Sequence, residues 1–267
     1  MKRIALGVQY DGTPWRGWQS QAGGGTVQDE LEAALARFTQ QQLRTVCAGR
    51  TDAGVHAVEQ VVHFDTDIAR DAYSWVRGVN SFLPDSIAVR WACEIPLDLG
   101  HPDQGFHARF SATARRYHYL LYNNKIRSPL WNGRAGWAFR PLDVAPMREA
   151  AQLLVGEHDF SAFRAAGCQA KSPVKTMHSV QIERYGDLVV FTLHASAFLH
   201  HMVRNLVGSL IYVGNGTENV AWFGDVLASR NRRLAAPTYM PDGLYLARID
   251  YPPQWVLPQA DMSLPWL

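Results

Sequence analysis

The chain has 267 residues, and its 26 lysines and arginines against 24 aspartates and glutamates give a formal net charge of +2. Hydrophobic residues make up 47% and charged residues 19%, which is typical of a globular protein and excludes a disordered one. The length suffices for one large domain or two modest ones. No apolar run approaches the roughly eighteen residues of a membrane span, so no membrane partner is expected.

The three cysteines are few and widely spaced. Cys47, Cys93 and Cys168 form no C-x-x-C pair. This pattern excludes a disulfide scaffold and a structural zinc site, and it favours a cytoplasmic location.

The first part of the chain alternates strand and helix patterns. Period-two alternation predicts a strand over residues 4–10, and "DGTPWRGWQ" predicts a turn after it. From Thr26 the apolar spacing becomes helical, with Thr26 as the N-cap. Further elements are expected as strands at 43–48, 58–64 and 86–94 and a helix at 70–79.

The second part repeats this organisation roughly. The patterns predict a strand at 115–124, a helix at 144–156, a hairpin turning at Gly186-Asp187, a helix at 197–214 and a strand at 243–251. Helices that interrupt strands in two halves indicate an α+β fold with mixed sheets. We expect an N-terminal half at 1–105, a C-terminal half at 106–251 and a surface tail at 252–267.

The stretch "AGRTDAGVHA" at residues 48–57 places one carboxylate between two glycines. Gly49 and Gly54 would let the backbone leave the strand sharply and hold Asp52 at the mouth of a cleft. Arg50 could keep that carboxylate ionised when a substrate excludes water. Asp52 could then serve as a metal ligand, a general base or a nucleophile, or it could simply cap a turn with Arg50 as its ion-pair partner.

Most of these roles for Asp52 would need further catalytic or metal-binding residues that the sequence does not clearly provide. His56 and His63 follow Asp52, but no second acid lies near them, so we expect no metal site. The paired carboxylates of a glycosidase are not evident. A Ser-His-Asp triad stays open, although no G-x-S-x-G turn is present.

Basic and aromatic residues concentrate in one interval. No acidic residue lies between Asp103 and Asp143, and the interval is rich in aromatic rings. Cations beside flat rings favour contact with RNA phosphates and unpaired bases. The basic residues of the interval are Arg109, Arg115, Arg116, Lys125, Arg127, Arg134 and Arg140.

The motif at 48–57 closely resembles the signature of the TruA family of tRNA pseudouridine synthases. Three further blocks, "FHARFSATARRYHYLLYN" at 106–123, "HHMVRNLVGSL" at 200–210 and "GLYL" at 243–246, look like other family blocks in the same order. The resemblance extends to about Tyr251. It implies a pseudouridine synthase fold of two similar halves, with largely antiparallel sheets flanked by helices and a central basic cleft.

The resemblance also implies roles for individual residues. Asp52 matches the catalytic aspartate, and Tyr117 matches the tyrosine that stacks on the target base. Arg50 matches the arginine that ejects the base, and Arg204 matches the basic partner of the aspartate. Residues that match pocket or tRNA-contact positions are Leu244, Phe106, His107, Ala108, Arg109, Phe110, Arg115, Arg116, Gly167, Cys168, Gln169, Ala170 and Lys171.

The activity implied is isomerisation of uridine in the anticodon stem and loop of tRNA, at positions 38, 39 and 40, by a homodimer without cofactor or metal. Two departures from the family pattern are a small insertion at 101–105 and the bulky pair Tyr239 and Met240. Two other classes stay open. One is a non-catalytic RNA-binding protein, and the other is a small-molecule hydrolase that uses Asp52 and His56.

Overall fold

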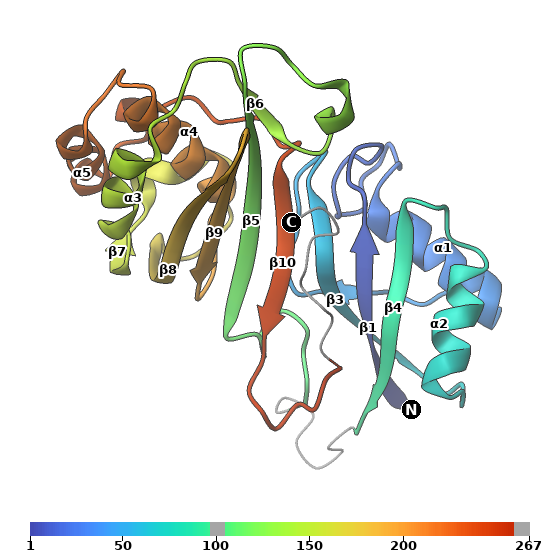
Figure 1. The fold of residues 1–267 in the computed structure, drawn as a ribbon. Coiled ribbons are helices and arrows are strands. Elements are labelled where there is room, and N and C mark those ends of the chain that lie inside the picture. The colour runs from blue at the N-terminus through green and yellow to red at the C-terminus, as the bar shows by residue number, and fades with distance from the viewer. Residues whose placement is uncertain (97–104, 259–267) are drawn as a thin grey trace. The chain divides into compact units, whose positions relative to one another are not determined.

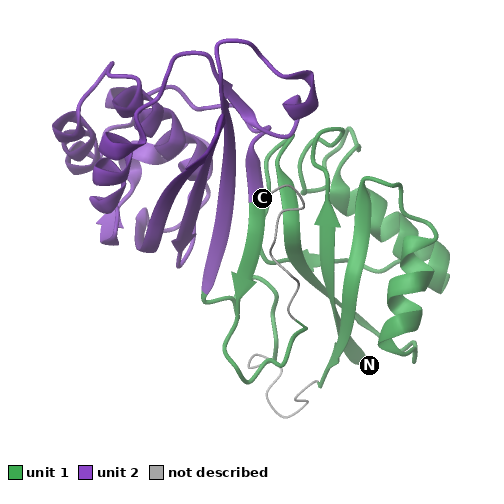
Figure 2. Cartoon of the chain, in the orientation of Figure 1, with its two compact units in different colours: residues 1–113, 246–267 green, residues 114–245 purple. Residues whose placement is uncertain are grey.

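The computed structural model describes residues 1–96 and 105–258. It divides into two compact units, residues 1–113 with 246–267, and residues 114–245 (Figure 2). We call them unit 1 and unit 2. The expected insertion at 101–105 falls, apart from Gly105, outside the described residues, as does the end of the expected tail.

In unit 1 the strand order is β4-β1-β3-β10 (Figure 1). Strand β1 pairs antiparallel with both β4 and β3, and the short β2 pairs antiparallel with β3. Its strands are β1 (Lys2–Tyr10), β2 (Val46–Cys47), β3 (His56–Thr66), β4 (Ile87–Ile95) and β10 (Leu244–Asp250). Two helices pack on one face, α1 (Val27–Thr39) and α2 (Ala72–Asn80).

The helices of unit 1 begin where their capping residues predict. The Thr26 side chain accepts from the backbone N–H of Asp29, and Asp71 caps α2 by accepting from Ser74. Trp75 of α2 lies between Phe64 of the sheet and Phe38 of α1, with ring centroids 5.4 and 5.5 Å away. This aromatic cluster joins both helices to the sheet.

In unit 2 the strand order is β5-β9-β8-β7, with antiparallel neighbours, and β6 runs parallel to β5. Its strands are β5 (Ala114–Asn123), β6 (Gly136–Ala138), β7 (Gly156–Asp159), β8 (Val174–Tyr185) and β9 (Leu188–Ala195). Its helices are α3 (Val144–Gln152), α4 (Met202–Gly214) and α5 (Val220–Ser229), with short 3-10 turns η2 (Pro129–Trp131), η3 (Ser161–Phe163) and η4 (Arg232–Leu234). The α+β class predicted from the sequence is confirmed.

Some predicted boundaries were wrong. The helix expected at 197–214 begins only at Met202, because His201 adopts a left-handed backbone with φ 60° that stops the helix from extending toward residue 197. The helix expected at 144–156 ends at Gln152. The strand expected at 43–48 is only two residues long.

A buried polar cluster fixes the start of α4. The amide of Asn205 is fully buried and donates from Nδ2 to the carbonyl of Phe163 at 2.8 Å. Its Oδ1 accepts from Arg232 at 3.0 Å and from Thr238 at 2.7 Å. Desolvation lowers the pKa of Arg232. The guanidinium of the half-buried Arg232 is therefore engaged by side chains of the protein itself.

Candidate active site

Asp52 lies in a tight turn between β2 and β3. Its backbone carbonyl accepts from the N–H of Val55 at 3.1 Å, and Gly54 adopts φ 78°, which only glycine reaches without strain. Thr51 is buried, whereas Asp52 is half-buried and its neighbours Arg50 and Ala53 are exposed. The turn therefore presents the carboxylate at the surface of unit 1.

The loop that follows β1 packs directly on this turn. The N–H of Trp18 donates to the carbonyl of Thr51 at 3.0 Å, and the N–H of Gly54 donates to the carbonyl of Trp15 at 3.3 Å. The hydroxyls of Tyr10 and Thr51 form a buried hydrogen bond of 2.8 Å. We call residues 10–18 the support loop, because its contacts flank Asp52 on both sides.

Two glycines allow the support loop to approach so closely. A Cβ on Gly17 would lie 2.6 Å from the carbonyl oxygen of Thr51 and 3.0 Å from the carbonyl carbon of Asp52. A Cβ on Gly12 would lie 2.0 Å from the carbonyl oxygen of Val55. Neither distance can accommodate a side chain, so the absence of a Cβ sets the position of the turn.

His56 is tied to the support loop. Its Nδ1 accepts from the backbone N–H of Gly12 at 3.0 Å, and the carboxylate of Asp11 lies 3.2 Å from the same nitrogen. A nitrogen that accepts cannot also donate in the neutral ring. With 3% of its surface exposed, His56 is a structural anchor, which weighs against the hydrolase alternative that pairs it with Asp52.

The segment 106–110 divides into buried anchors and exposed tips. Phe106 and Ala108 are fully buried, whereas Phe110 is 76% exposed and Arg109 is exposed beside it. The His107 ring stacks on Phe110 with centroids 4.3 Å apart. The segment is therefore anchored by Phe106 and Ala108 and presents Arg109 and Phe110 at the surface.

The anchors are held by His63 and Tyr251. His63 Nδ1 accepts from the N–H of Ala108 at 3.1 Å, and the hydroxyl of Tyr251 donates to the carbonyl of Ala108 at 2.7 Å. Burial, together with the nearby charge of Arg3, lowers the pKa of His63 to about 4, so the ring stays neutral at physiological pH. Arg3 binds both carboxylate oxygens of Asp65, each at 2.7 Å.

In unit 2, Tyr117 lies in β5 opposite Leu193 of β9. It is 8% exposed, and its ring meets Phe198 edge-on at 5.0 Å between centroids. Arg115 donates to the carbonyl of Ser196 at 3.2 Å. Burial and the charge of Arg116, two residues away on the same face of β5, lower the pKa of His118 to about 4.

Arg204 lies in the first turn of α4. Its Nε donates to the carbonyl of Tyr239 at 2.8 Å, and the N–H of Tyr239 donates back to the carbonyl of Arg204 at 3.3 Å. Burial raises the pKa of Tyr239 to about 12, so its hydroxyl stays protonated and donates to the carbonyl of Trp137 at 2.6 Å. Leu244, 5% exposed, follows shortly after on β10.

The loop 167–171 is held from below by Arg164, which donates to the carbonyls of Cys168 at 2.7 Å and Ala170 at 3.0 Å. Partial burial acts to raise the pKa of the Cys168 thiol. Hydrogen bonds from the backbone N–H groups of Ala170 and His200 and from Arg164 outweigh it, so the pKa is lowered. The exposed members of the loop are Gly167, Gln169 and Lys171.

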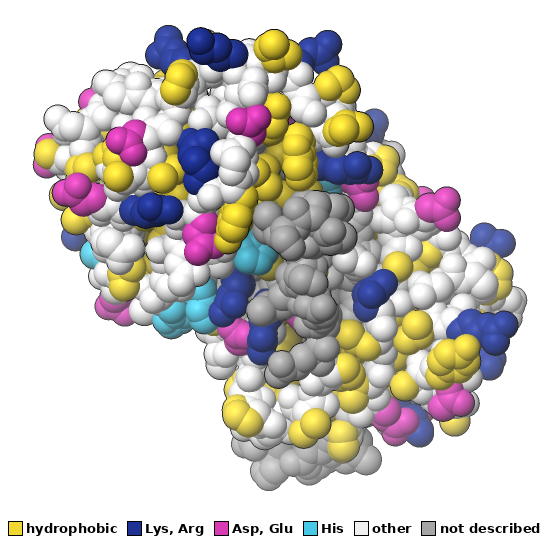
Figure 3. All heavy atoms as spheres, viewed as in Figure 1, with side chains coloured by type: hydrophobic (Ala, Val, Ile, Leu, Met, Phe, Trp, Pro, Cys, Tyr) yellow, Lys and Arg dark blue, Asp and Glu magenta, His cyan; other side chains and the backbone are white. Residues whose placement is uncertain are grey.

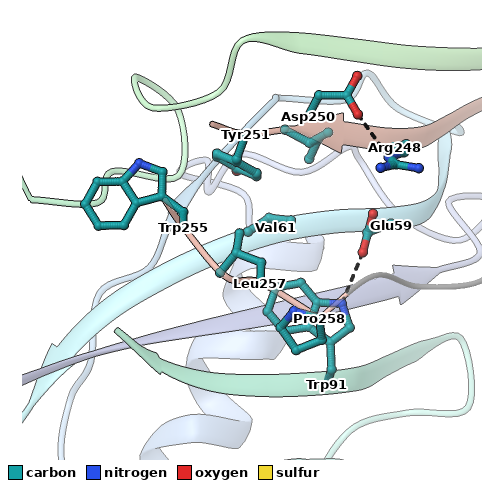
Figure 4. Close-up of a pocket in the computed structure, with 10 residues that line it drawn as sticks. Glu59, Val61, Trp91, Arg248, Asp250, Tyr251, Trp255, Leu257 and Pro258 are labelled. Carbon is teal, nitrogen blue, oxygen red and sulfur yellow. Dashed lines mark hydrogen bonds and ion pairs between the residues drawn. The ribbon is translucent and has the colours of Figure 1, made fainter. Parts of the chain in front are cut away.

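A cavity of about 90 Å³ in unit 1 lies apart from these residues (Figure 4). Trp91 donates from Nε1 to Glu59 at 3.1 Å on one wall, and Arg248 pairs with Asp250 at 2.9 Å on another. The C-terminal segment contributes Trp255, Leu257 and Pro258 to the lining. None of the residues predicted for the site is among the described residues that line this cavity.

The comparisons with known proteins agree on one family. A sequence profile described as tRNA pseudouridine synthase matches residues 7–110 and 150–252. The tRNA pseudouridine synthase A of Herminiimonas arsenicoxydans is 68% identical over 262 residues, which cover 98% of this chain and 94% of that protein. The namesake from Bordetella petrii is 59% identical over 265 residues, with coverage of 98% and 96%.

The chain belongs to the tRNA pseudouridine synthase family. The resemblance to the TruA type read from the motifs is thereby confirmed, and with it the class of enzyme, an isomerase. Among solved structures, a chain of a Cbf5–Nop10–Gar1 complex is similar with a TM-score of 0.38 and 13% identity, covering 91% of this chain and 48% of that one. Within the described residues, no helix combines the length and apolarity needed to cross a bilayer.

The sequence motifs located the turn of this pseudouridine synthase, but they missed the support loop as a functional element. The stretch "DGTPWRGWQ" predicted a turn, but nothing in it indicates what that turn contacts. The signal that could have found it is the pair Gly12 and Gly17, since glycines in a short polar loop often mark a close backbone approach.

Gly17→Ala tests the close approach. The substitution combines a strained φ of 86° with a clash against the backbone of Thr51 and Asp52. Gly24→Ala is the matched control, because Gly24 has φ 61° with nothing within 4 Å of its Cβ position. We expect Gly24→Ala to lower the free energy of unfolding by about 1 kcal/mol. Gly17→Ala should lose at least about 1 kcal/mol more. Equal losses in urea titrations would show that the contact is not tight.

His63→Asn tests the neutral histidine, since Asn Oδ1 can replace Nδ1 as acceptor but cannot titrate. The native pKa of about 4 lies below the unfolded value near 6.5, so the unfolded chain binds more protons between these values. The contribution of neutral His63 to the free energy of unfolding should therefore be fully present above pH about 6.5 and fall toward pH 4. In this range His63 should add up to about 1.4 kcal/mol per pH unit to the slope of the free energy of unfolding against pH. Urea unfolding across this range should show a smaller slope in the variant, and an unchanged slope would contradict the assignment.

Proposed function

We propose that this chain isomerises uridine to pseudouridine in the anticodon stem and loop of tRNA, at positions 38, 39 and 40, with Asp52 as the nucleophile. The observation that carries the proposal is the half-buried carboxylate on a turn whose backbone is fixed on both sides, within a motif that matches the family signature. A nucleophile acts efficiently when its geometry is set before the substrate arrives.

The chemistry is a redox-neutral rearrangement. A carboxylate oxygen of Asp52 adds to a carbon of the target nucleoside, and the glycosidic bond between the sugar and ring nitrogen one breaks. The uracil turns, ring carbon five bonds to the sugar carbon, and the bond between the nucleoside and the Asp52 oxygen breaks, which restores the free carboxylate. The hydrogen of carbon five leaves as a proton while nitrogen one gains one. Attack at ring carbon six or at the sugar carbon gives the same product.

Four other residues have proposed roles in the reaction, namely Tyr117, Arg204, Leu244 and Arg50. Tyr117 stacks on the extruded base, and its edge-on contact with Phe198 supports a fixed ring orientation. Arg204, held on the carbonyl of Tyr239, provides a cation for the carboxylate, and Leu244 lines the base pocket. Extruding the base costs a few kcal/mol. Arg50, which is exposed, takes the place of the extruded base and offsets this cost by stacking on the neighbouring bases.

Binding of tRNA is supported by a projecting segment of unit 2, residues 124–140, which we call the basic lobe. Its cations Lys125, Arg127, Arg134 and Arg140 are all exposed, and Phe139 is 57% exposed with Arg140 over its ring. Figure 3 shows Lys and Arg side chains beside hydrophobic ones along the upper edge of this face. Cations interspersed with exposed rings suit phosphates and unpaired bases.

The basic lobe is also rigidly anchored. Trp137 donates from Nε1 to the carbonyl of Asn124 at 2.9 Å, and the hydroxyl of Tyr245 donates to the carbonyl of Arg134 at 2.6 Å. These bonds anchor the lobe at two backbone carbonyls and do not use the charged side chains of its cations. A preorganised lobe loses little conformational entropy on binding RNA.

The tRNA-contact set extends to Phe106–Phe110 and to Gly167–Lys171, where Arg109, Phe110 and Lys171 are exposed. We further propose a cytoplasmic homodimer that needs neither cofactor nor metal. The resemblance to the TruA family supports these points, and the three cysteines, all free, are compatible with a reducing compartment.

Asp52→Asn tests the nucleophile. Because the amide is a poor nucleophile of nearly the same shape, release of the carbon-five hydrogen from tRNA should be abolished while tRNA affinity stays near the wild-type value. Asp85→Asn, at an exposed carboxylate elsewhere in unit 1, is the control and should be fully active. Full turnover by Asp52→Asn would remove the assignment.

A triple substitution, Lys125→Gln, Arg127→Gln and Arg140→Gln, tests the basic lobe. If each cation neutralises one phosphate, the slope of log K against log salt should shrink by about 2 to 3, and KM should rise while kcat stays unchanged. The control carries the same charge change at exposed residues of unit 1, Arg70→Gln, Arg77→Gln and Arg90→Gln. The same salt slope in both triple variants would exclude a specific role for the lobe.

A further inference from the structure

The residue before Asp52 is held through a buried pair of hydroxyl groups. Tyr10 is the last residue of β1, and 3% of it is exposed, whereas Thr51 is 7% exposed. Their oxygens lie 2.8 Å apart. Because a buried hydroxyl without a partner costs about 1 to 3 kcal/mol, each group holds the other in one rotamer.

Irregular pairing of β1 with its neighbours directs the Tyr10 side chain toward the turn that carries Asp52. The pairing of β1 with β3 shifts between Val8 and Tyr10, and its pairing with β4 shifts between Gly7 and Val8. Such irregularities bend a strand and redirect its side chains, and they are frequent beside active sites. The Tyr10 ring then packs against Trp18, with centroids 5.9 Å apart. The phenol therefore has a fixed position set by two neighbouring strands.

The hydroxyl pair complements the backbone contacts of the turn. Thr51 is held at its carbonyl by Trp18 and at its side chain by Tyr10, and Gly54 is held by Trp15. The side-chain bond between Tyr10 and Thr51 can be removed by a single atom change without touching the backbone. Tyr10 itself is too buried to meet a tRNA.

We propose that Tyr10 is a positioning residue, whose hydroxyl acts through Thr51 to hold the Asp52 carboxylate in the geometry of attack. The inference rests on the proposed nucleophilic role of Asp52. Small displacements of a reacting group cost up to about a hundredfold in rate. Since the two backbone bonds remain, removing the hydroxyl should cost roughly tenfold in the single-turnover rate, with tRNA affinity unchanged.

The test is a double-mutant cycle measured as single-turnover rate at saturating enzyme. Tyr10→Phe and Thr51→Val should each lower the rate roughly tenfold, and the double variant should be no slower than either single one, because both remove the same bond. Thr51→Ser keeps the hydroxyl and should retain most of the rate. Thr39→Val is the matched control, since it removes a buried hydroxyl that donates to the Leu35 carbonyl at 2.7 Å in α1.

The control separates positioning from stability. Thr39→Val should lower the melting temperature as Thr51→Val does, yet keep the wild-type rate well below that temperature. A normal rate for Tyr10→Phe, rate losses that multiply in the double variant, or an equal loss in Thr39→Val would each overturn the inference. If Asp52→Asn is inactive and Tyr10→Phe is normal, only the positioning role fails. If Asp52→Asn is fully active, the nucleophile assignment fails, and the positioning role that rests on it fails with it.

Discussion

The close approach of the support loop to the Asp52 turn is the constraint on which the rest of the site depends. Gly12 and Gly17 leave no room for a Cβ against the backbone of Val55, Thr51 and Asp52. Only at that separation can the loop's backbone groups and the Tyr10 hydroxyl reach the turn. These contacts fix the backbone of the small solvent-facing turn, which suits the nucleophilic role proposed for Asp52.

The second constraint is the burial of polar groups beneath the segments that are proposed to touch RNA. His63 stays neutral and accepts from Ala108, while Arg3 and Asp65 neutralise one another nearby. In unit 2, Arg164 holds two carbonyls of the loop 167–171, and Asn205 in the first turn of α4 holds the carbonyl of Phe163. Each such group fixes a backbone segment, so exposed side chains on that segment can contact a ligand without first being ordered.

The basic side chains divide into exposed ones and ones that bond within the protein. A net charge of +2 is too small to attract RNA by itself, but four of the five exposed cations of the acid-free interval lie on the basic lobe, and the fifth is Arg109. Other cations have interior tasks, as Arg232 does beside Asn205 and Arg204 does on the Tyr239 carbonyl. A count of basic residues therefore overstates the surface available for phosphates, and only burial separates the two groups.

The sequence by itself determined the class of fold, the family and the local elements whose signals are local. Thr26 caps α1 and Gly186 turns the β8–β9 hairpin because caps and turns depend on neighbouring residues alone. The "AGRTDAGVHA" motif likewise identified Asp52. The start of α4 at Met202 was not predicted, because the left-handed backbone of His201 has no signature in the spacing of hydrophobic residues.

Only the tertiary structure decided that Tyr10 and Trp18 hold Thr51. It likewise decided that Phe106 and Ala108 are buried anchors rather than exposed tips, and that the chain returns to unit 1 at Leu246 of β10. These are contacts between residues distant in the chain, and the side-chain pattern of a strand or loop does not specify which distant segment will pack against it.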